Sequence, residues 1–182
     1  MNNIKIVITG GPGSGKTEII YELEKQGFYV MHEYSRLLFK EAKKKGVKDA
    51  FKDDPLKFSN SLLDVRIKQF KSASDLKYNL SKPCVFFDRG IHDIYAYLCA
   101  IKKKNDFKNI IFSYSYDLVF LLKPWEKIYC HDNERIESFS ESKKFFNYIE
   151  LVYKEAKIKT KIVPNDTIKN RVNFIINYMK KN

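Results

Sequence analysis

The segment Gly10–Thr17 constrains the fold of this chain more than any other feature. It reads Gly-Gly-Pro-Gly-Ser-Gly-Lys-Thr and matches the phosphate-binding pattern G-x-x-x-x-G-K-[ST] in full. It lies between an apolar run typical of a buried strand, residues 4–9, and a segment with helical periodicity, residues 15–25. Strand, loop and helix in this order are what the motif requires, so the sequence predicts a P-loop site for a nucleoside triphosphate.

The residue types of this loop suit a phosphate cradle. Glycines allow tight turns that aim backbone N–H groups at phosphate oxygens, and the following helix adds the positive end of its dipole. Lys16 is expected to reach the β- and γ-phosphates and to act in catalysis, while the Thr17 hydroxyl binds Mg²⁺. A glycine-rich turn that binds nothing is the alternative, and a dinucleotide fingerprint would leave Lys16 and Thr17 without a role. The predicted nucleotide-binding residues are Gly11, Gly13, Ser14, Gly15, Lys16 and Thr17.

Hydrophobic runs of strand length alternate with longer helical segments along the chain. This alternation is typical of an α/β fold in which helices cover both faces of a parallel sheet, here a three-layer P-loop NTPase fold. At 182 residues, the chain is expected to form a single domain over residues 1–182. The predicted strands are residues 4–9, 28–32, 84–87, 117–122 and 160–163. The predicted helices are residues 15–25, 34–44, 55–80, 92–103, 138–156 and 167–180.

The polar segment 124–137 follows the fourth predicted strand and is expected to be a lid. Ligands of such sheets lie beyond the carboxyl ends of the strands, where this segment begins. It combines aromatic residues such as Trp125 with the cations Lys127 and Arg135. Closure would bring Arg135 or Lys127 against the phosphates, where it would stabilise charge in the transition state. An ordinary surface loop with Trp125 packed underneath is the alternative.

Asp88 ends the apolar run Val85-Phe86-Phe87 and is the predicted partner of Mg²⁺, or of its bound water, opposite Thr17. The fourth predicted strand ends in Leu121-Leu122-Lys123 and offers no acid there. An aspartate in this position can also be a helix cap or turn residue. The complete P-loop favours the metal.

Glu33 follows the second predicted strand and is expected to face the cleft beside the γ-phosphate. There it would orient or deprotonate an acceptor hydroxyl, although it also suits the first turn of the next helix. Arg36 and Arg89 are candidates for binding substrate phosphate, or for pairing with Glu33 and Asp88.

Composition sets further bounds on the function. The net charge of +12 comes from scattered lysines, which favours solvated helix faces that attract small anions over specific nucleic-acid binding. The cysteines Cys84, Cys99 and Cys130 are too few and too widely spaced for a disulfide framework or a zinc cluster. No stretch approaches the roughly 20 apolar residues that cross a bilayer, and no signal peptide is visible, so a cytoplasmic protein is expected.

With these motifs in place, the chain resembles the P-loop AAA-like domain shared by NadR-type nicotinamide riboside kinases and a group of small ATPases. The resemblance rests on the P-loop, Glu33–Arg36, Phe87–Gly90 with Asp93 and Tyr97, residues 117–123, and Pro124-Trp125 with Asp132 and Arg135. It implies a parallel sheet of strand order 2-3-1-4-5 and adds Asp93 to the candidate substrate-binding residues. The riboside kinases carry a further acid near Arg89 and Gly90, and this chain does not.

These observations predict a Mg²⁺-dependent phosphotransferase that moves a γ-phosphoryl group to a nucleoside-like small molecule. The alternative is a regulatory ATPase or GTPase switch that acts through a protein or lipid partner. Fold alone does not separate the two. The sequence leaves open whether ATP or GTP is bound, which acceptor is used, and the oligomeric state.

Overall fold

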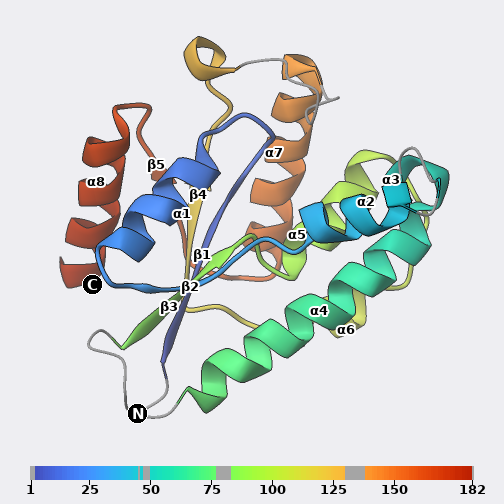
Figure 1. Ribbon diagram of the computed structural model, residues 1–182, viewed down its shortest axis with the longest axis horizontal. Helices are drawn as coiled ribbons and strands as arrows, with labels where there is room; N and C mark the ends of the chain where they lie inside the picture. The colour runs from blue at the N-terminus through green and yellow to red at the C-terminus, as the bar shows by residue number, and fades with distance from the viewer. Residues whose placement is uncertain (1–2, 45, 47–49, 77–82, 130–137, 182) are drawn as a thin grey trace.

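The computed structural model describes residues 3–44, 46, 50–76, 83–129 and 138–181 of the chain. Its centre is one parallel sheet of five strands in the order β2-β3-β1-β4-β5, which confirms the predicted α/β class and strand order (Figure 1). The strands are β1 (Ile4–Gly10), β2 (Tyr29–Met31), β3 (Cys84–Asp88), β4 (Leu118–Leu122) and β5 (Thr160–Val163).

The three central strands are buried on both faces, and their composition explains why. All residues of β3 and β4 are buried, and so are all of β1 after Ile4. Runs of this kind cannot face water on either side, so they require a helical layer on each. The edge strands β2 and β5 are partly exposed, as each has a neighbour on one side only.

Helices form the two outer layers (Figure 1). On one face, α1 (Lys16–Lys25) and α8 (Ile168–Lys181) share a core with Ile6, Ile8 and Phe120 of the sheet. On the other face, four helices pack around Val7, Phe87 and Val119. These are α4 (Pro55–Asp75), α5 (His92–Ala100), α6 (Lys108–Phe112) and α7 (Phe139–Glu155).

Two further helices, α2 (Ser35–Lys44) and α3 (Ala50–Asp53), pack on α4 beside the carboxyl ends of the strands. The Phe39 ring of α2 lies 4.6 Å from the Phe58 ring of α4, measured between centroids. Because α2 begins two residues after Glu33, this extra helical layer starts next to that residue.

Several predicted boundaries are wrong. The helix predicted over residues 92–103 ends at Ala100, because Lys102 takes a left-handed conformation (φ 57) that ends the helical path. The short helices α3 and α6 and the 3₁₀ turn η1 (Glu126–Ile128) were not predicted, since segments this short carry almost no periodic signal. The helix predicted over residues 55–80 is described as far as Asp75, and residues 77–80 lie outside the described part.

Among the helices that the structure describes, none combines the length and apolar content needed to cross a bilayer. The single domain and the lid over residues 124–137 remain predictions.

Candidate functional site

The phosphate loop connects β1 directly to α1 and is largely buried. Gly13 and Gly15 have left-handed backbones, with φ of 71 and 80, which most side chains would strain. The N-terminus of α1 has no side-chain cap. Its first-turn N–H groups therefore have no side-chain acceptor in the loop, as an anion site at a helix N-terminus requires.

The Lys16 side chain lies folded into this loop. Its ammonium group donates to the carbonyl oxygens of Gly10 (2.9 Å) and Gly11 (2.8 Å) and to the Ser14 hydroxyl (3.2 Å). Burial, and then the nearby charge of Arg89, lower the pKa of Lys16 to about 7, although Asp88 and Glu33 act in the opposite direction. A bound triphosphate would raise that pKa again, because it places negative charge beside the ammonium.

Strand register brings the two predicted carboxylates together. Asp88 at the end of β3 pairs with Ile8 of β1, and Met31 at the end of β2 pairs with Phe87. Glu33 comes two residues after Met31, so it lies beside the end of β3. A cavity of about 240 Å³ there is lined by Thr17, Ile20, Tyr21, His32, Glu33 and Asp88.

Asp88 has a buried carboxylate, and one of its oxygens lacks a hydrogen-bond partner among the described residues. Its side chain is 8% exposed, and the oxygen in question is Oδ1. Burial, and then the neighbouring Glu33, raise the pKa of Asp88 to about 6. Thr17 lines the same cavity. The Asp88 carboxylate and the Thr17 hydroxyl, together with phosphate oxygens, would be suitable ligands for a hard cation such as Mg²⁺. The described residues contain no cluster of three histidine, cysteine or acidic side chains, so a metal here would depend on the nucleotide and water for its other ligands.

Glu33 is held by two arginines. Its Oε1 atom lies 2.7 Å from Arg89 Nε and 3.8 Å from Arg66 Nη2, and it accepts a hydrogen bond of 2.7 Å from the Ser35 hydroxyl. Burial alone would raise the pKa of Glu33, but Arg89 and Arg66 outweigh it and lower the pKa to about 2. The carboxylate is therefore ionised and fixed in direction at neutral pH.

Arg89 reaches Glu33 from a left-handed backbone (φ 71), which costs a residue other than glycine about 1–2 kcal/mol. Its Nη1 atom donates to the Tyr97 hydroxyl (3.1 Å) and, less closely, to the Gly10 carbonyl (3.3 Å). From this backbone position, the Arg89 guanidinium contacts both Glu33 and the phosphate loop. Of the two sequence alternatives for Arg89, the structure shows pairing with Glu33.

Asp93 lies near this site but does not line its cavity. It is 1% exposed and accepts hydrogen bonds from the Thr9 hydroxyl (2.8 Å) and the Gly90 N–H (3.0 Å). These contacts join the end of β1 to the turn after β3. Substrate binding by Asp93 stays a prediction, and the contacts shown are all within the protein.

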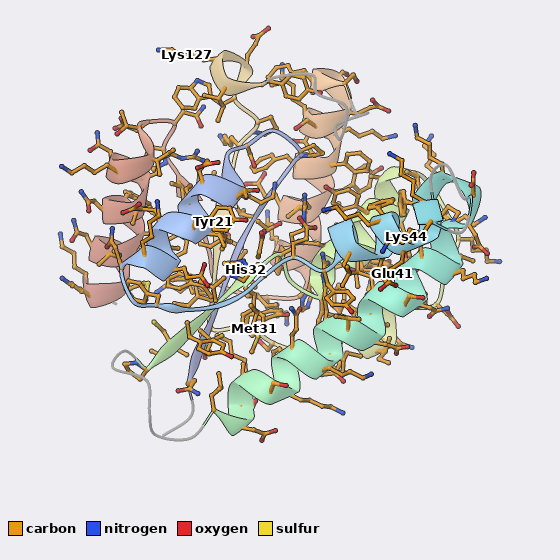
Figure 2. The ribbon with its side chains drawn as sticks, in the orientation of Figure 1. Tyr21, Met31, His32, Glu41, Lys44 and Lys127 are labelled. Carbon is orange, nitrogen blue, oxygen red and sulfur yellow. The ribbon has the colours of Figure 1, made fainter. Side chains whose placement is uncertain are left out.

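Tyr21 and His32 lie near one another at the mouth of the cavity, with ring centroids 6.0 Å apart (Figure 2). Both line the cavity, and His32 also contacts Glu24 of α1 at 2.9 Å. They are the exposed neighbours of an otherwise buried group of charges.

Two predicted site residues are not placed by the structure. Arg135 lies outside the described residues, as does the lid from residue 130 onward, and the Arg36 side chain is likewise outside the described part. The described start of the lid contains η1, whose Ile128 side chain would lie 3.2 Å from a Cβ added to Gly15. This part of the predicted lid therefore lies next to the phosphate loop.

Sequence reasoning missed Arg66, which is 5% exposed and donates to the Gly90 carbonyl at 2.7 Å. A usable signal existed. Arg66 lies on the apolar face of α4, at helical spacing from the buried Leu62, Leu63 and Ala73. An arginine on such a face needs a buried acceptor or carboxylate, so this position pointed to an ion-pair site.

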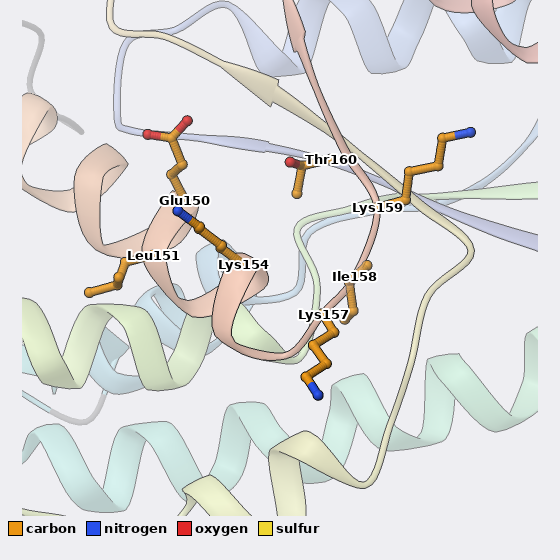
Figure 3. Close-up of a pocket in the computed structure, with 7 residues that line it drawn as sticks. All are labelled: Glu150, Leu151, Lys154, Lys157, Ile158, Lys159 and Thr160. Carbon is orange, nitrogen blue, oxygen red and sulfur yellow. The ribbon is translucent and has the colours of Figure 1, made fainter.

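A second hollow of about 680 Å³ lies far from the phosphate loop, between the end of α7 and the start of β5 (Figure 3). Its residues are Glu150, Leu151, Lys154, Lys157, Ile158, Lys159 and Thr160. It is larger than the cavity beside Asp88, but it adjoins the amino end of a strand, and ligands of this sheet type lie at the carboxyl ends.

The protein family described as AAA domain matches residues 5–171, which is nearly the whole chain and includes every site residue named above. No curated protein matches the chain at a significant level.

Solved structures of nucleoside and nucleotide kinases share the fold. Deoxyadenosine kinase from M. mycoides, solved with bound dATP, superposes with a TM-score of 0.70 at 19% identity, covering 97% of this chain and 99% of the kinase chain. Thymidylate kinase from Ehrlichia chaffeensis gives 0.65 at 16% identity, covering 99% and 100%. Thymidylate kinase from Candida albicans gives 0.65 at 16% identity, covering 99% and 92%.

Proposed function

Because this chain belongs to the AAA domain family, we propose that it is a Mg²⁺-dependent phosphotransferase that moves the γ-phosphoryl group of a nucleoside triphosphate to a nucleoside-like acceptor. One observation carries the proposal. Thr17, Asp88 and Glu33 line a single cavity beside the phosphate loop, and Glu33 is held there by two arginines. The likeness to deoxyadenosine and thymidylate kinases shows the fold and agrees with this class of acceptor.

The donor side of the reaction is the phosphate loop. Lys16, now bonded to the loop carbonyls, would move to the β- and γ-phosphates and neutralise charge there. Asp88 and Thr17 would hold Mg²⁺, which when bound supplies positive charge against the phosphate oxygens.

The acceptor side is Glu33 with its arginines. A carboxylate with a pKa of about 2 is far below the range of an efficient general base at neutral pH. Phosphoryl transfer depends mainly on alignment and charge, so Glu33 serves here by accepting a hydrogen bond from the acceptor hydroxyl and aiming its oxygen at the γ-phosphorus. Of the two roles predicted for Glu33, its ion pairs with Arg89 and Arg66 favour orientation over proton removal.

The test is a panel of nucleosides and small alcohols incubated with γ-labelled ATP or GTP and Mg²⁺, with label transfer measured apart from hydrolysis. We expect at least one nucleoside to take up label and to stimulate triphosphate turnover. If label is released only as inorganic phosphate with every acceptor on the panel, the phosphotransferase proposal is wrong. The regulatory switch would then be the better interpretation.

A further inference from the structure

Arg171 of α8 is buried against the outer side of the phosphate loop. It is 2% exposed, and its Nη1 atom donates a hydrogen bond of 3.0 Å to the carbonyl oxygen of Ser14. Ser142 of α7 does the same on the other side of the loop, where its hydroxyl donates to the Pro12 carbonyl at 2.6 Å. Two helices that follow different strands therefore anchor loop carbonyls from outside.

The Ser142 hydroxyl uses its only donor in this contact, whereas Arg171 has further N–H donors. The Nε and Nη2 atoms of Arg171 are buried and have no hydrogen-bond partner among the described residues. In a planar guanidinium group, these two nitrogens form one edge whose N–H bonds point the same way and match a pair of neighbouring acceptors.

The charge of Arg171 also lacks a carboxylate partner in the described part of the chain. Burial lowers the pKa of its guanidinium. Unpartnered buried donors and an unpaired buried charge both destabilise a protein, so such groups need an explanation. A ligand that supplies two acceptors would offset the cost.

The position of Arg171 indicates which part of a nucleotide would reach it. In the proposed function the γ-phosphate end lies at Thr17, Asp88 and Glu33, on the β3 side of β1. The nucleoside end would then leave the loop on the side of β4 and β5. On that side, a Cβ added to Gly15 would lie 2.8 Å from Arg171 Nη1 and 3.2 Å from Ile128 Cδ1. The segments after β4 and β5 thus meet the loop at this residue.

We propose that the Nε–Nη2 edge of Arg171 binds the base of the donor nucleotide and selects guanine. Guanine presents two neighbouring acceptors, O6 and N7, which are the partners of a bidentate arginine. Adenine presents N7 beside an N6 donor, which leaves one N–H of Arg171 facing another N–H. This inference rests on the proposed function, since it names the donor of the same reaction.

Access to this edge requires a movement, because Nε and Nη2 are shielded from solvent. The chain beside Gly15 at this point is η1, a single 3₁₀ turn whose Ile128 is 36% exposed. Besides Arg171, Ile128 is the side chain within 4 Å of a Cβ added to Gly15, so the proposal takes η1 as the segment that moves aside when a base binds.

The first test uses the unaltered protein. Equilibrium binding would be measured in Mg²⁺ with GTP, inosine triphosphate, 7-deaza-GTP and ATP. Inosine triphosphate keeps O6 and N7, whereas 7-deaza-GTP has lost N7. We expect GTP and inosine triphosphate to bind on the order of tenfold more tightly than 7-deaza-GTP and ATP.

The second test separates the free edge from the loop anchor. Arg171→Lys keeps the charge and one donor for the Ser14 carbonyl but removes the planar edge. We expect it to lower GTP affinity to the level of ATP and to change ATP affinity little. Ser142→Ala is the matched control, because it removes only a loop anchor and should weaken both triphosphates by the same factor.

Four outcomes would overturn the inference. Equal binding of all four nucleotides, or an unchanged ratio of GTP to ATP affinity in a folded Arg171→Lys protein, would show that Arg171 only anchors the loop while the proposed function stands. A loss in Arg171→Lys that is the same for GTP, ATP and inorganic tripolyphosphate would place the edge on a phosphate. If the unaltered protein bound no triphosphate, this inference and the proposed function would fall together.

Discussion

The Nε atom of Arg89 lies 2.7 Å from a carboxylate oxygen of Glu33, and this contact joins the turn after β3 to the turn after β2. Both residues are mostly buried, with 12% and 14% of their side chains exposed. Such a pair keeps its geometry, because breaking it would leave one charge buried alone. The direction of the Glu33 carboxylate is therefore set by the protein before any acceptor binds.

Removing the charge of Glu33 and of Asp88 should damage different steps. Glu33→Gln should lower transfer to an acceptor by at least about 10²-fold through loss of alignment, while background hydrolysis persists. Asp88→Asn should lower both transfer and hydrolysis, since it weakens the hold on Mg²⁺. Label transfer and phosphate release, measured in parallel, check this pair, and unchanged transfer in Glu33→Gln would refute the acceptor role.

Lys16→Ala and Thr17→Ala should also differ. Lys16→Ala removes the charge beside the phosphates and should weaken triphosphate binding at least about tenfold with or without Mg²⁺. Thr17→Ala removes a metal ligand and should reduce mainly the gain in affinity that Mg²⁺ provides. Calorimetric titrations with and without Mg²⁺ provide the measurement. Equal affinity in Lys16→Ala and the unaltered protein would contradict the P-loop assignment.

The start of the lid should become protected when nucleotide binds. Residues 124–129 follow β4, and Ile128 among them lies next to Gly15 of the phosphate loop. Closure over a nucleotide would order these residues, so their hydrogen exchange should slow in saturating triphosphate and Mg²⁺. Exchange at α6, which packs on the sheet face opposite α1 and α8, serves as the internal control. No slowing at saturation would mean a passive loop.

Stability should depend on His92 in mildly acidic solution. The ring is 0% exposed, lies among Phe112, Tyr116 and Tyr153, and has no hydrogen-bond partner for either nitrogen among the described residues. Burial lowers its pKa from 6.5 to about 4. Between these values the unfolded chain binds a proton that the native state excludes, so the free energy of unfolding falls as pH drops from 6.5 to 4, by about 3 kcal/mol.

His92→Leu should remove this contribution. Urea unfolding of both proteins between pH 7 and 4.5 measures the two slopes, and the variant should lose less stability over that range. Parallel slopes would mean that His92 is not kept neutral by burial.

The basic surface should give weak, nonspecific binding to nucleic acid that salt removes. The net charge of +12 supplies general attraction to phosphates, and no recognition motif accompanies it. Binding of DNA and RNA fragments of several sequences at low and physiological salt provides the measurement. Sub-micromolar, sequence-selective binding at physiological salt would show a dedicated interface.

Sequence alone determined the features that depend on neighbours along the chain. The phosphate loop is a continuous motif, and the five strands are short apolar runs, so both could be located without coordinates. The sequence also predicted that Asp88 and Glu33 lie close together, because they stand at the ends of two strands and the carboxyl ends of parallel strands meet at one edge of a sheet. The limits of α5 and the existence of α3 and α6 depend on local backbone choices that leave little periodic signal.

Only the tertiary structure shows which groups the buried polar and charged side chains contact. Arg66 contacts the Gly90 carbonyl across 24 residues of sequence, Ser142 contacts Pro12 across 130, and Arg171 contacts Ser14 across 157. The sequence left open whether Arg89 binds substrate or pairs with Glu33, and the structure shows the contact with Glu33. Such pairings follow from how whole helices pack on the sheet, and the energy that selects them is spread over many apolar contacts, so no local pattern of residues encodes them.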